Sequence, residues 1–131
     1  MDLNGKVVLV TGGTGSFGKQ FCKTVLERYK LRKLIIFSRD ELKQFEMQHD
    51  PAFRDREEMR YFIGDVRDFD RLEMAFRDVD YVIHAAALKH IPAAEYNPFE
   101  CIKTNVHGAE NVVRAAIRCN IKRVIALSTD K

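Results

Sequence analysis

The sequence predicts an α/β fold, a doubly wound parallel sheet of about five strands with helices on both faces. Short β-branched runs alternate with longer segments of helical periodicity, an order typical of parallel strands joined by right-handed helical crossovers. The first run, residues 6–10, is apolar at four consecutive positions, as in a central strand covered on both faces. A glycine-rich segment joins that run to the first helical pattern.

The expected strands are short and β-branched, and we place them at residues 6–10, 33–37, 60–63, 81–84 and 123–127. The expected helices have apolar positions at helical spacing, and we place them at residues 16–28, 40–47, 69–76 and 97–119. Asp40 and Asp68 are expected to cap their helices, Pro98 to open the last helix and Asn120 to end it. The charged segment 48–59 is expected to be a loop or a frayed helix end.

Composition fits one soluble domain over residues 1–131, with 46% hydrophobic and 31% charged residues. The net charge of +3 comes from interspersed charges, which favours a solvated surface over a nucleic-acid partner. No apolar run approaches the roughly 20 residues that cross a bilayer, and no signal peptide is evident, so we expect no membrane contact and a cytoplasmic location. The cysteines lack metal-ligand spacing, and we expect buried or idle thiols and no metal site.

The segment 11–18 predicts a phosphate-binding turn between a strand and a helix. Two registers fit: Gly13, Gly15 and Gly18 match G-x-G-x-x-G, and Gly12 with the last two matches G-x-x-G-x-x-G. Such glycines permit a tight turn, let a pyrophosphate approach backbone amides and let the helix pack closely. A simple turn is the alternative, and a P-loop is disfavoured because no Gly-Lys-Ser/Thr follows. The second register resembles the short-chain dehydrogenase/reductase class. The residues expected to bind cofactor here are Gly12, Thr14, Gly15, Ser16, Phe17 and Gly18.

The end of the second strand bears on the choice between NAD and NADP. An acid at that place usually binds the ribose 2′-hydroxyl of NAD, whereas this chain has Ser38 and Arg39 there and Asp40 one residue later. Arg39 can pair with a 2′-phosphate through charge-assisted hydrogen bonds, which favours NADP. The alternative is that Arg39 is a surface charge and Asp40 only a helix cap.

The next two strand ends also carry expectations. In the resembled class, a pair such as Asp65 and Val66 borders the adenine, the alternative being a simple strand-end turn. Small residues after the fourth strand would let the sheet edge lie against the cofactor, and His84 is expected to be a packed histidine rather than a catalyst. Those small residues are Ala85, Ala86 and Ala87.

Longer strings narrow the resemblance. Residues 38–44, 64–68, 85–92, 95–98, 104–106 and 127–131 are similar to the inverting 4,6-dehydratases that act on UDP-N-acetylglucosamine, within the extended short-chain dehydrogenase/reductases. That polysaccharide-biosynthesis family makes the first intermediate for pseudaminic acid and related surface sugars. The resemblance implies a Rossmann-type sheet, an NADP cofactor and a UDP-sugar substrate. It also implies cofactor contacts at Glu41, Lys43, Lys89, Thr104 and Asn105.

The resemblance implies elimination of water from the sugar through a 4-keto intermediate. Thr129 would hydrogen-bond the C4 oxygen, Asp130 would be the acid at C6 and Lys131 the base at C5. A lysine base needs a depressed pKa, from desolvation or nearby cations. Lys89, near nicotinamide and substrate in the family, can supply such a charge. A solvated loop pair is the alternative for Asp130 and Lys131.

The family's Tyr-x-x-x-Lys and substrate domain would follow Lys131, so we expect an inactive fragment. Its fifth strand would be a bare edge, which predicts poor solubility or association between copies, and we expect a homo-oligomer. Two other functions remain open: a nucleotide-sugar epimerase or reductase on the same fold, and a non-catalytic dinucleotide-binding module.

Overall fold

The computed structural model describes residues 2–85 and 98–126; within the second range, side chains are described for residues 108–125. All five strands of the sheet are parallel. The strands are β1 (Val7–Thr11), β2 (Lys33–Ser38), β3 (Met59–Ile63), β4 (Tyr81–His84) and β5 (Arg123–Ala126). The helices are α1 (Ser16–Arg28), α2 (Glu41–His49), α3 (Phe69–Ala75) and α5 (Pro98–Arg118).

The strand order is β3-β2-β1-β4-β5, which confirms the predicted fold class. The chain moves outward from β1 to β2 and β3, then returns to the other side of β1 with β4 and β5. The order therefore reverses between β1 and β4. In open α/β sheets, ligands bind beyond the carboxyl ends of the strands at such a reversal.

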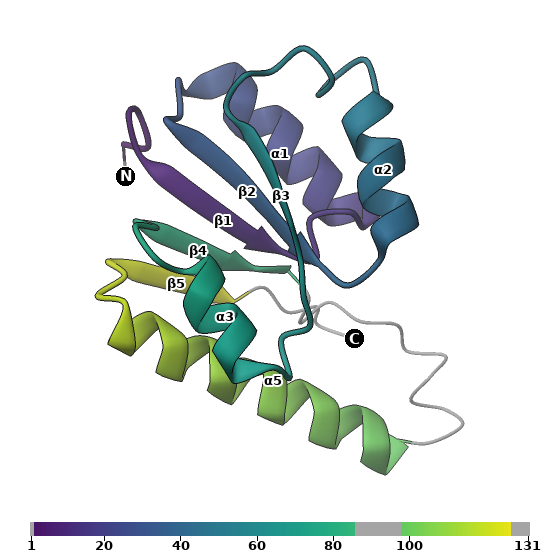
Figure 1. Ribbon diagram of the computed structural model, residues 1–131, viewed down its shortest axis with the longest axis vertical. Helices are drawn as coiled ribbons and strands as arrows, with labels where there is room; N and C mark the ends of the chain where they lie inside the picture. The colour runs from purple at the N-terminus through teal and green to yellow at the C-terminus, as the bar shows by residue number, and fades with distance from the viewer. Residues whose placement is uncertain (1, 86–97, 127–131) are drawn as a thin grey trace.

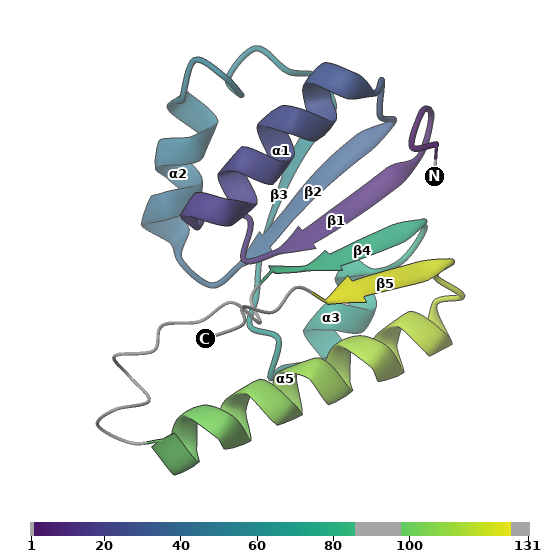
Figure 2. The same cartoon turned by 180° about the vertical axis from the view of Figure 1, so that it is seen from behind.

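Two helical layers enclose the sheet, with α1 and α2 on one face and α3 and α5 on the other (Figures 1 and 2). Every residue of β1 is buried. Val8 and Val10 belong to the cluster under α1 and α2, whereas Val7 and Leu9 belong to the cluster under α3 and α5. This alternation explains why β1 is apolar throughout: both of its faces are core.

The predicted caps Asp40, Asp68 and Asn120 are confirmed. The Asp40 side chain accepts a hydrogen bond from Lys43 N at 3.0 Å, and Asp68 accepts one from Arg71 N at 3.2 Å. Asn120 follows α5 with φ +56°, and Ile121 N donates to Ala116 O at 3.0 Å. That combination is the left-handed C-terminal turn expected of asparagine.

The charged segment after α2 differs in detail from its prediction. The helix extends to His49, and hydrogen-bonded turns then occupy the chain up to β3. Phe53 is only 1% exposed and packs in the cluster under α1 and α2. The segment is therefore a loop anchored by one aromatic side chain, a long-range contact that charge patterning cannot indicate.

Candidate nucleotide-binding site

The glycine loop lies at the carboxyl end of β1, directly before α1 (Figure 2). Gly12 has φ +70°, a conformation that favours glycine. A Cβ on Gly18 would lie 2.6 Å from Gly12 O and 2.6 Å from Gly13 Cα, so no side chain fits there. A Cβ on Gly13 would lie 3.0 Å from Ile36 Cδ1, which is a tighter contact than usual. Of the two possible registers, the geometry therefore favours the one that begins at Gly12.

The N-terminus of α1 is open. Gly15 is the N-cap, so no side chain caps the helix, and the first turn contains no acidic residue. The first i→i−4 hydrogen bond of α1 is the one from Lys19 N to Gly15 O, at 2.9 Å. The amides of Ser16, Phe17 and Gly18 therefore come before the regular hydrogen bonds of the helix. Ser16 and Phe17 are exposed, and Thr14 is buried. This end can accept an anion through backbone N–H groups and the helix dipole.

Backbone hydrogen bonds connect the glycine loop to the ends of β2 and β3. Gly12 N donates to Phe37 O at 2.9 Å, and Gly64 N donates to Ser38 O at 2.9 Å. A Cβ on Gly64 would lie 2.5 Å from Phe37 Cζ, so the close approach of the two strand ends requires glycine. The carboxyl ends of these three strands thus form one connected edge.

Three charged side chains meet at this edge. Arg67 contacts both carboxylate oxygens of Asp65, and its Nη2 lies 2.7 Å from Oδ2. Arg39 Nη1 is 3.6 Å from the same Oδ2, with 58% of its side chain exposed. The hydrogen bond from Arg67 lowers the pKa of Asp65 to about 2, and the charge of Arg39 adds to the effect. These three side chains together therefore carry one net positive charge, and both guanidinium groups are more than half exposed.

Asp40 and its neighbours form the first turn of α2. The Asp40 carboxylate is engaged by Lys43 N, and both Glu41 and Lys43 are exposed. Asp40 therefore serves as a helix cap, as the sequence indicated.

His84 and Thr11 lie side by side on β4 and β1. His84 is 3% exposed, Thr11 is fully buried, and the Nδ1···Oγ1 distance is 2.7 Å. The prediction of a packed histidine is confirmed. Ala85, which follows His84, is also buried.

Two amide side chains with structural contacts near the site, one buried and one half-buried, were not predicted from the sequence. Asn111 Nδ2, from α5, donates to Val66 O and Arg67 O, each at 3.0 Å. Gln44, from α2, is 2% exposed and donates to oxygens of Ser38 and Phe62. The only available signal was an amide residue on the inward face of a helix, where burial requires hydrogen-bond partners.

Several predicted site residues cannot be placed in this geometry. Thr104 and Asn105 lie within α5, but their side chains are outside the described part. The other predicted positions outside the described residues are Ala86, Ala87, Lys89, Thr129, Asp130 and Lys131.

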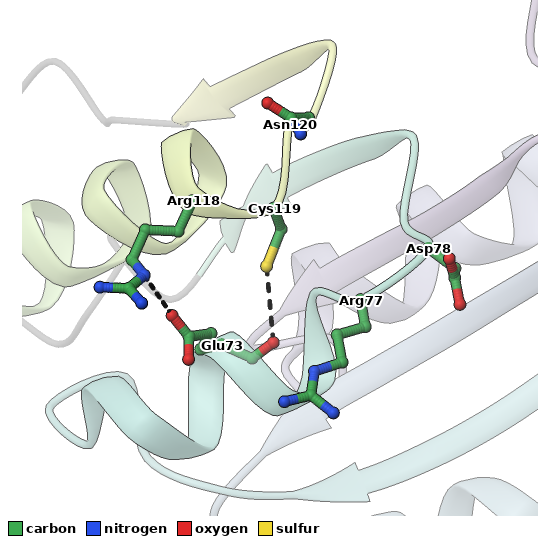
Figure 3. A pocket seen from close by; sticks show the side chains of 6 residues that line it. All are labelled: Glu73, Arg77, Asp78, Arg118, Cys119 and Asn120. Carbon is green, nitrogen blue, oxygen red and sulfur yellow. Dashed lines mark hydrogen bonds and ion pairs between the residues drawn. The ribbon is translucent and has the colours of Figure 1, made fainter.

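A hollow of about 440 Å³ lies at the opposite edge of the sheet, before the starts of β4 and β5 (Figure 3). Its lining residues include Arg77 and Asn120, and Arg118 pairs with Glu73 at 2.6 Å. This hollow lies at the amino ends of the strands, so it is separate from the candidate nucleotide-binding site at their carboxyl ends.

Within residues 2–85 and 98–126, no cluster of His, Cys, Asp or Glu could hold a metal ion. Burial raises the pKa of Cys22 to about 12, so this thiol is inert at neutral pH. None of the helices in these ranges has the length and apolar character needed to cross a membrane.

The reversed strand order and the glycine loop with its open helix define a Rossmann-type domain of the short-chain dehydrogenase/reductase kind. The chain belongs to the polysaccharide biosynthesis protein family, whose sequence profile matches residues 8–131. This membership confirms the resemblance inferred from the sequence.

Two groups of relatives are similar along almost the whole chain. A Campylobacter jejuni protein named UDP-N-acetylglucosamine 4,6-dehydratase (inverting) is 64% identical over 128 residues, which are 98% of this chain and 37% of the relative. A Rickettsia bellii protein named UDP-glucose 4-epimerase is 46% identical over 129 residues, 96% of this chain and 37% of the relative. The chain thus spans little more than a third of the length of these relatives.

Solved structures confirm the fold. Pen from Bacillus thuringiensis superposes with a TM-score of 0.87 at 44% identity, over 96% of this chain and 38% of that one. The dTDP-glucose 4,6-dehydratase DesIV from Streptomyces venezuelae, a double mutant with NAD and DAU bound, gives a TM-score of 0.77 at 26% identity, over 93% of this chain and 39% of that one.

Proposed function

We propose that this chain is the NADP-binding part of a C5-inverting UDP-N-acetylglucosamine 4,6-dehydratase. The observation that carries the proposal is the 64% identity to the Campylobacter dehydratase over 98% of the chain. The identity to the Rickettsia epimerase is lower, at 46%. The run Thr129, Asp130 and Lys131 fits a dehydratase better than an epimerase. Loss of water needs an acid and a base, whereas epimerisation at C4 does not need this pair.

The glycine loop is the proposed pyrophosphate site. The amides of Ser16, Phe17 and Gly18 precede the helical ladder of α1, and Gly15 leaves them open to an anion. The N-termini of α2 and α3, by contrast, are capped by Asp40 and Asp68. Of these three helices, α1 alone presents an uncapped N-terminus.

NADP is the proposed dinucleotide because of two side chains at the end of β2. One oxygen of the Asp40 carboxylate accepts from Lys43 N, so Asp40 acts as the cap of α2. The Arg39 guanidinium is largely exposed and contacts Asp65 at 3.6 Å with one nitrogen. It therefore has donors available for a 2′-phosphate.

In the proposed reaction, NADP+ held by the glycine loop and Arg39 would supply the redox chemistry, a reversible hydride transfer with no external reductant. Thr129 orients the C4 oxygen, Lys131 removes the C5 proton, and Asp130 protonates the departing C6 hydroxyl. As the resemblance implies, Lys89 would supply a positive charge near the nicotinamide and the sugar. Ala85, Ala86 and Ala87 border the cofactor, and Thr104 and Asn105 support the active site.

The chain is proposed to act in the cytoplasm, to need residues beyond position 131 for turnover, and to form homo-oligomers. It makes no functional contact with nucleic acid or membrane.

The test is an NMR-monitored incubation with UDP-N-acetylglucosamine. The enzyme is a chimera in which residues after Lys131 come from the Campylobacter relative, and its Lys131→Ala variant is the matched comparison. The proposal predicts a C5-inverted 4-keto-6-deoxy sugar from the first and none from the second. An NADP-binding chimera that leaves the sugar unchanged would contradict it, and one that only epimerises C4 would establish the epimerase alternative.

A further inference from the structure

Gln44 is an unusual occupant of the inward face of α2. Its side chain is 2% exposed, in a helix whose other buried position is the apolar Met47. A buried amide costs free energy unless it is hydrogen-bonded, and an apolar residue would fill the same space without that cost. The hydrogen bonds of the Gln44 amide should therefore account for its presence at this position.

Those contacts lie at the edge of the proposed cofactor site. Gln44 Nε2 is 2.9 Å from Ser38 Oγ, 3.3 Å from Ser38 O and 3.2 Å from Phe62 O. Ser38 is the last residue of β2, and Phe62 is the penultimate residue of β3. One amide nitrogen thus holds the ends of two neighbouring strands together.

The same residue also anchors the other side of Arg39. The backbone N of Gln44 donates to Asp40 O at 3.1 Å, and the Asp40 side chain accepts from Lys43 N. Arg39 therefore lies between Ser38, which the Gln44 side chain binds, and Asp40, whose carbonyl accepts the first backbone hydrogen bond of α2. Its own side chain reaches outward, 58% exposed, to within 3.6 Å of Asp65.

We propose that Gln44 is a positioning residue for cofactor selection: its side chain fixes Ser38, the residue before Arg39, and so orients Arg39 and sets the preference for a dinucleotide with a 2′-phosphate over one without it. This inference rests on the proposed NADP-binding function. Gln44 is buried beneath the turn and acts through Arg39, without touching the cofactor.

The experiment compares dissociation constants of NADP+ and NAD+, measured by calorimetry on this chain and on Gln44→Met. Methionine keeps the length and helix propensity of glutamine and removes the donor. We expect NADP+ affinity to fall about tenfold and NAD+ affinity to change less than about twofold, as for the loss of one well-placed interaction. Gln48→Met is the matched control, because Gln48 is one turn further along the same helix and exposed; it should leave both constants unchanged.

Two outcomes would overturn the inference. An unchanged ratio of the two constants in Gln44→Met, with both affinities retained or both reduced in parallel, would mean that Gln44 only ties the helix to the sheet. Full additivity of Gln44→Met with Arg39→Ala would mean that Gln44 does not act through Arg39. Should Gln44→Met fail to fold, Gln44→Asn takes its place with the same expected direction, because its amide is one methylene too short to keep these contacts.

Failure of the underlying function gives a different result. A wild-type chain that binds neither dinucleotide, or that prefers NAD+, would remove the NADP proposal whatever Gln44 does. A wild-type preference for NADP+ that survives Gln44→Met would remove only the role of Gln44.

Discussion

Arg67 and Asp65 form a two-pronged ion pair just after β3, with Arg67 Nε 3.2 Å from Oδ1 and Nη2 2.7 Å from Oδ2. Arg67 N also donates to Asp65 Oδ1 at 2.9 Å, so the pair is part of a local turn. Because Oδ2 faces Arg39 as well, this carboxylate connects the end of β3 to the end of β2. Its ionisation should therefore affect the folded state measurably.

The first prediction concerns pH. The pKa of Asp65 is lowered from 3.8 to about 2, so its contribution to stability is present above about pH 4 and lost as pH falls toward 2. Asp65→Asn should lower the free energy of unfolding at pH 7 by about 1 kcal/mol, a modest value because the arginines are solvent-screened. The difference from wild type should vanish near pH 2 in urea denaturation. Asp55→Asn, at a carboxylate that is 88% exposed, should show almost no difference, and an equal loss in both variants would refute the assignment.

The second prediction concerns the glycine loop. Gly18→Ala places a Cβ 2.6 Å from Gly12 O, so the loop must move; we expect a stability loss of at least about 2 kcal/mol and loss of dinucleotide binding. Gly15→Ala is the matched comparison, because its Cβ would meet only an ordinary 3.5 Å contact and its φ is −75°. Thermal unfolding should separate the two variants, and equal melting temperatures would be inconsistent with the described packing.

The third prediction concerns Arg39. Arg39→Ala should weaken NADP+ binding by about 10- to 100-fold and leave NAD+ binding nearly unchanged, since one charge-assisted contact to the 2′-phosphate is removed. The comparison is Arg54→Ala, another exposed arginine, in the loop after α2. A parallel loss of NAD+ affinity in Arg39→Ala would show that the guanidinium does not discriminate between the two cofactors.

The fourth prediction concerns Asn111, which joins α5 to the turn after β3. Asn111→Ala leaves the carbonyls of Val66 and Arg67 without this donor, so we expect a loss of about 1–2 kcal/mol in the free energy of unfolding. Val113→Ala, at a side chain that is 51% exposed on the same helix, should cost much less. Chemical denaturation that ranks these variants in the reverse order would contradict the contact.

The fifth prediction concerns association. Among the described residues β5 pairs with β4 alone, and an edge strand offers unpaired backbone groups to another copy. We expect sedimentation velocity to show concentration-dependent association. A single monomeric species across the accessible concentration range would count against the proposed homo-oligomer.

The sequence was informative wherever structure depends on local pattern. The run through β1, the caps Asp40 and Asp68, and the left-handed Asn120 each depend on a residue and its near neighbours, and all were predictable. The glycine loop was equally clear as a motif, but choosing its register needed the backbone conformation of Gly12, with φ +70°.

Contacts between distant segments were not predictable in this way. The burial of Phe53 and the hydrogen bonds of Gln44 and Asn111 depend on how strands and helices meet in space, which neither periodicity nor composition encodes. The same applies to Asp65, whose pairing with Arg39 exists only because β2 and β3 are neighbours. The roles of Thr129, Asp130 and Lys131 remain predictions.

The most direct test of the central claim is an amide-resolved NMR titration of the isotopically labelled chain with NADP+. The account predicts the largest shifts at the backbone amides of Gly12, Gly15, Ser16 and Phe17, and at Arg39, with no change around Arg77 and Arg118 in the hollow at the opposite edge. An absence of shifts at saturating NADP+, or shifts confined to that hollow, would contradict the claim that this edge of the sheet binds the dinucleotide.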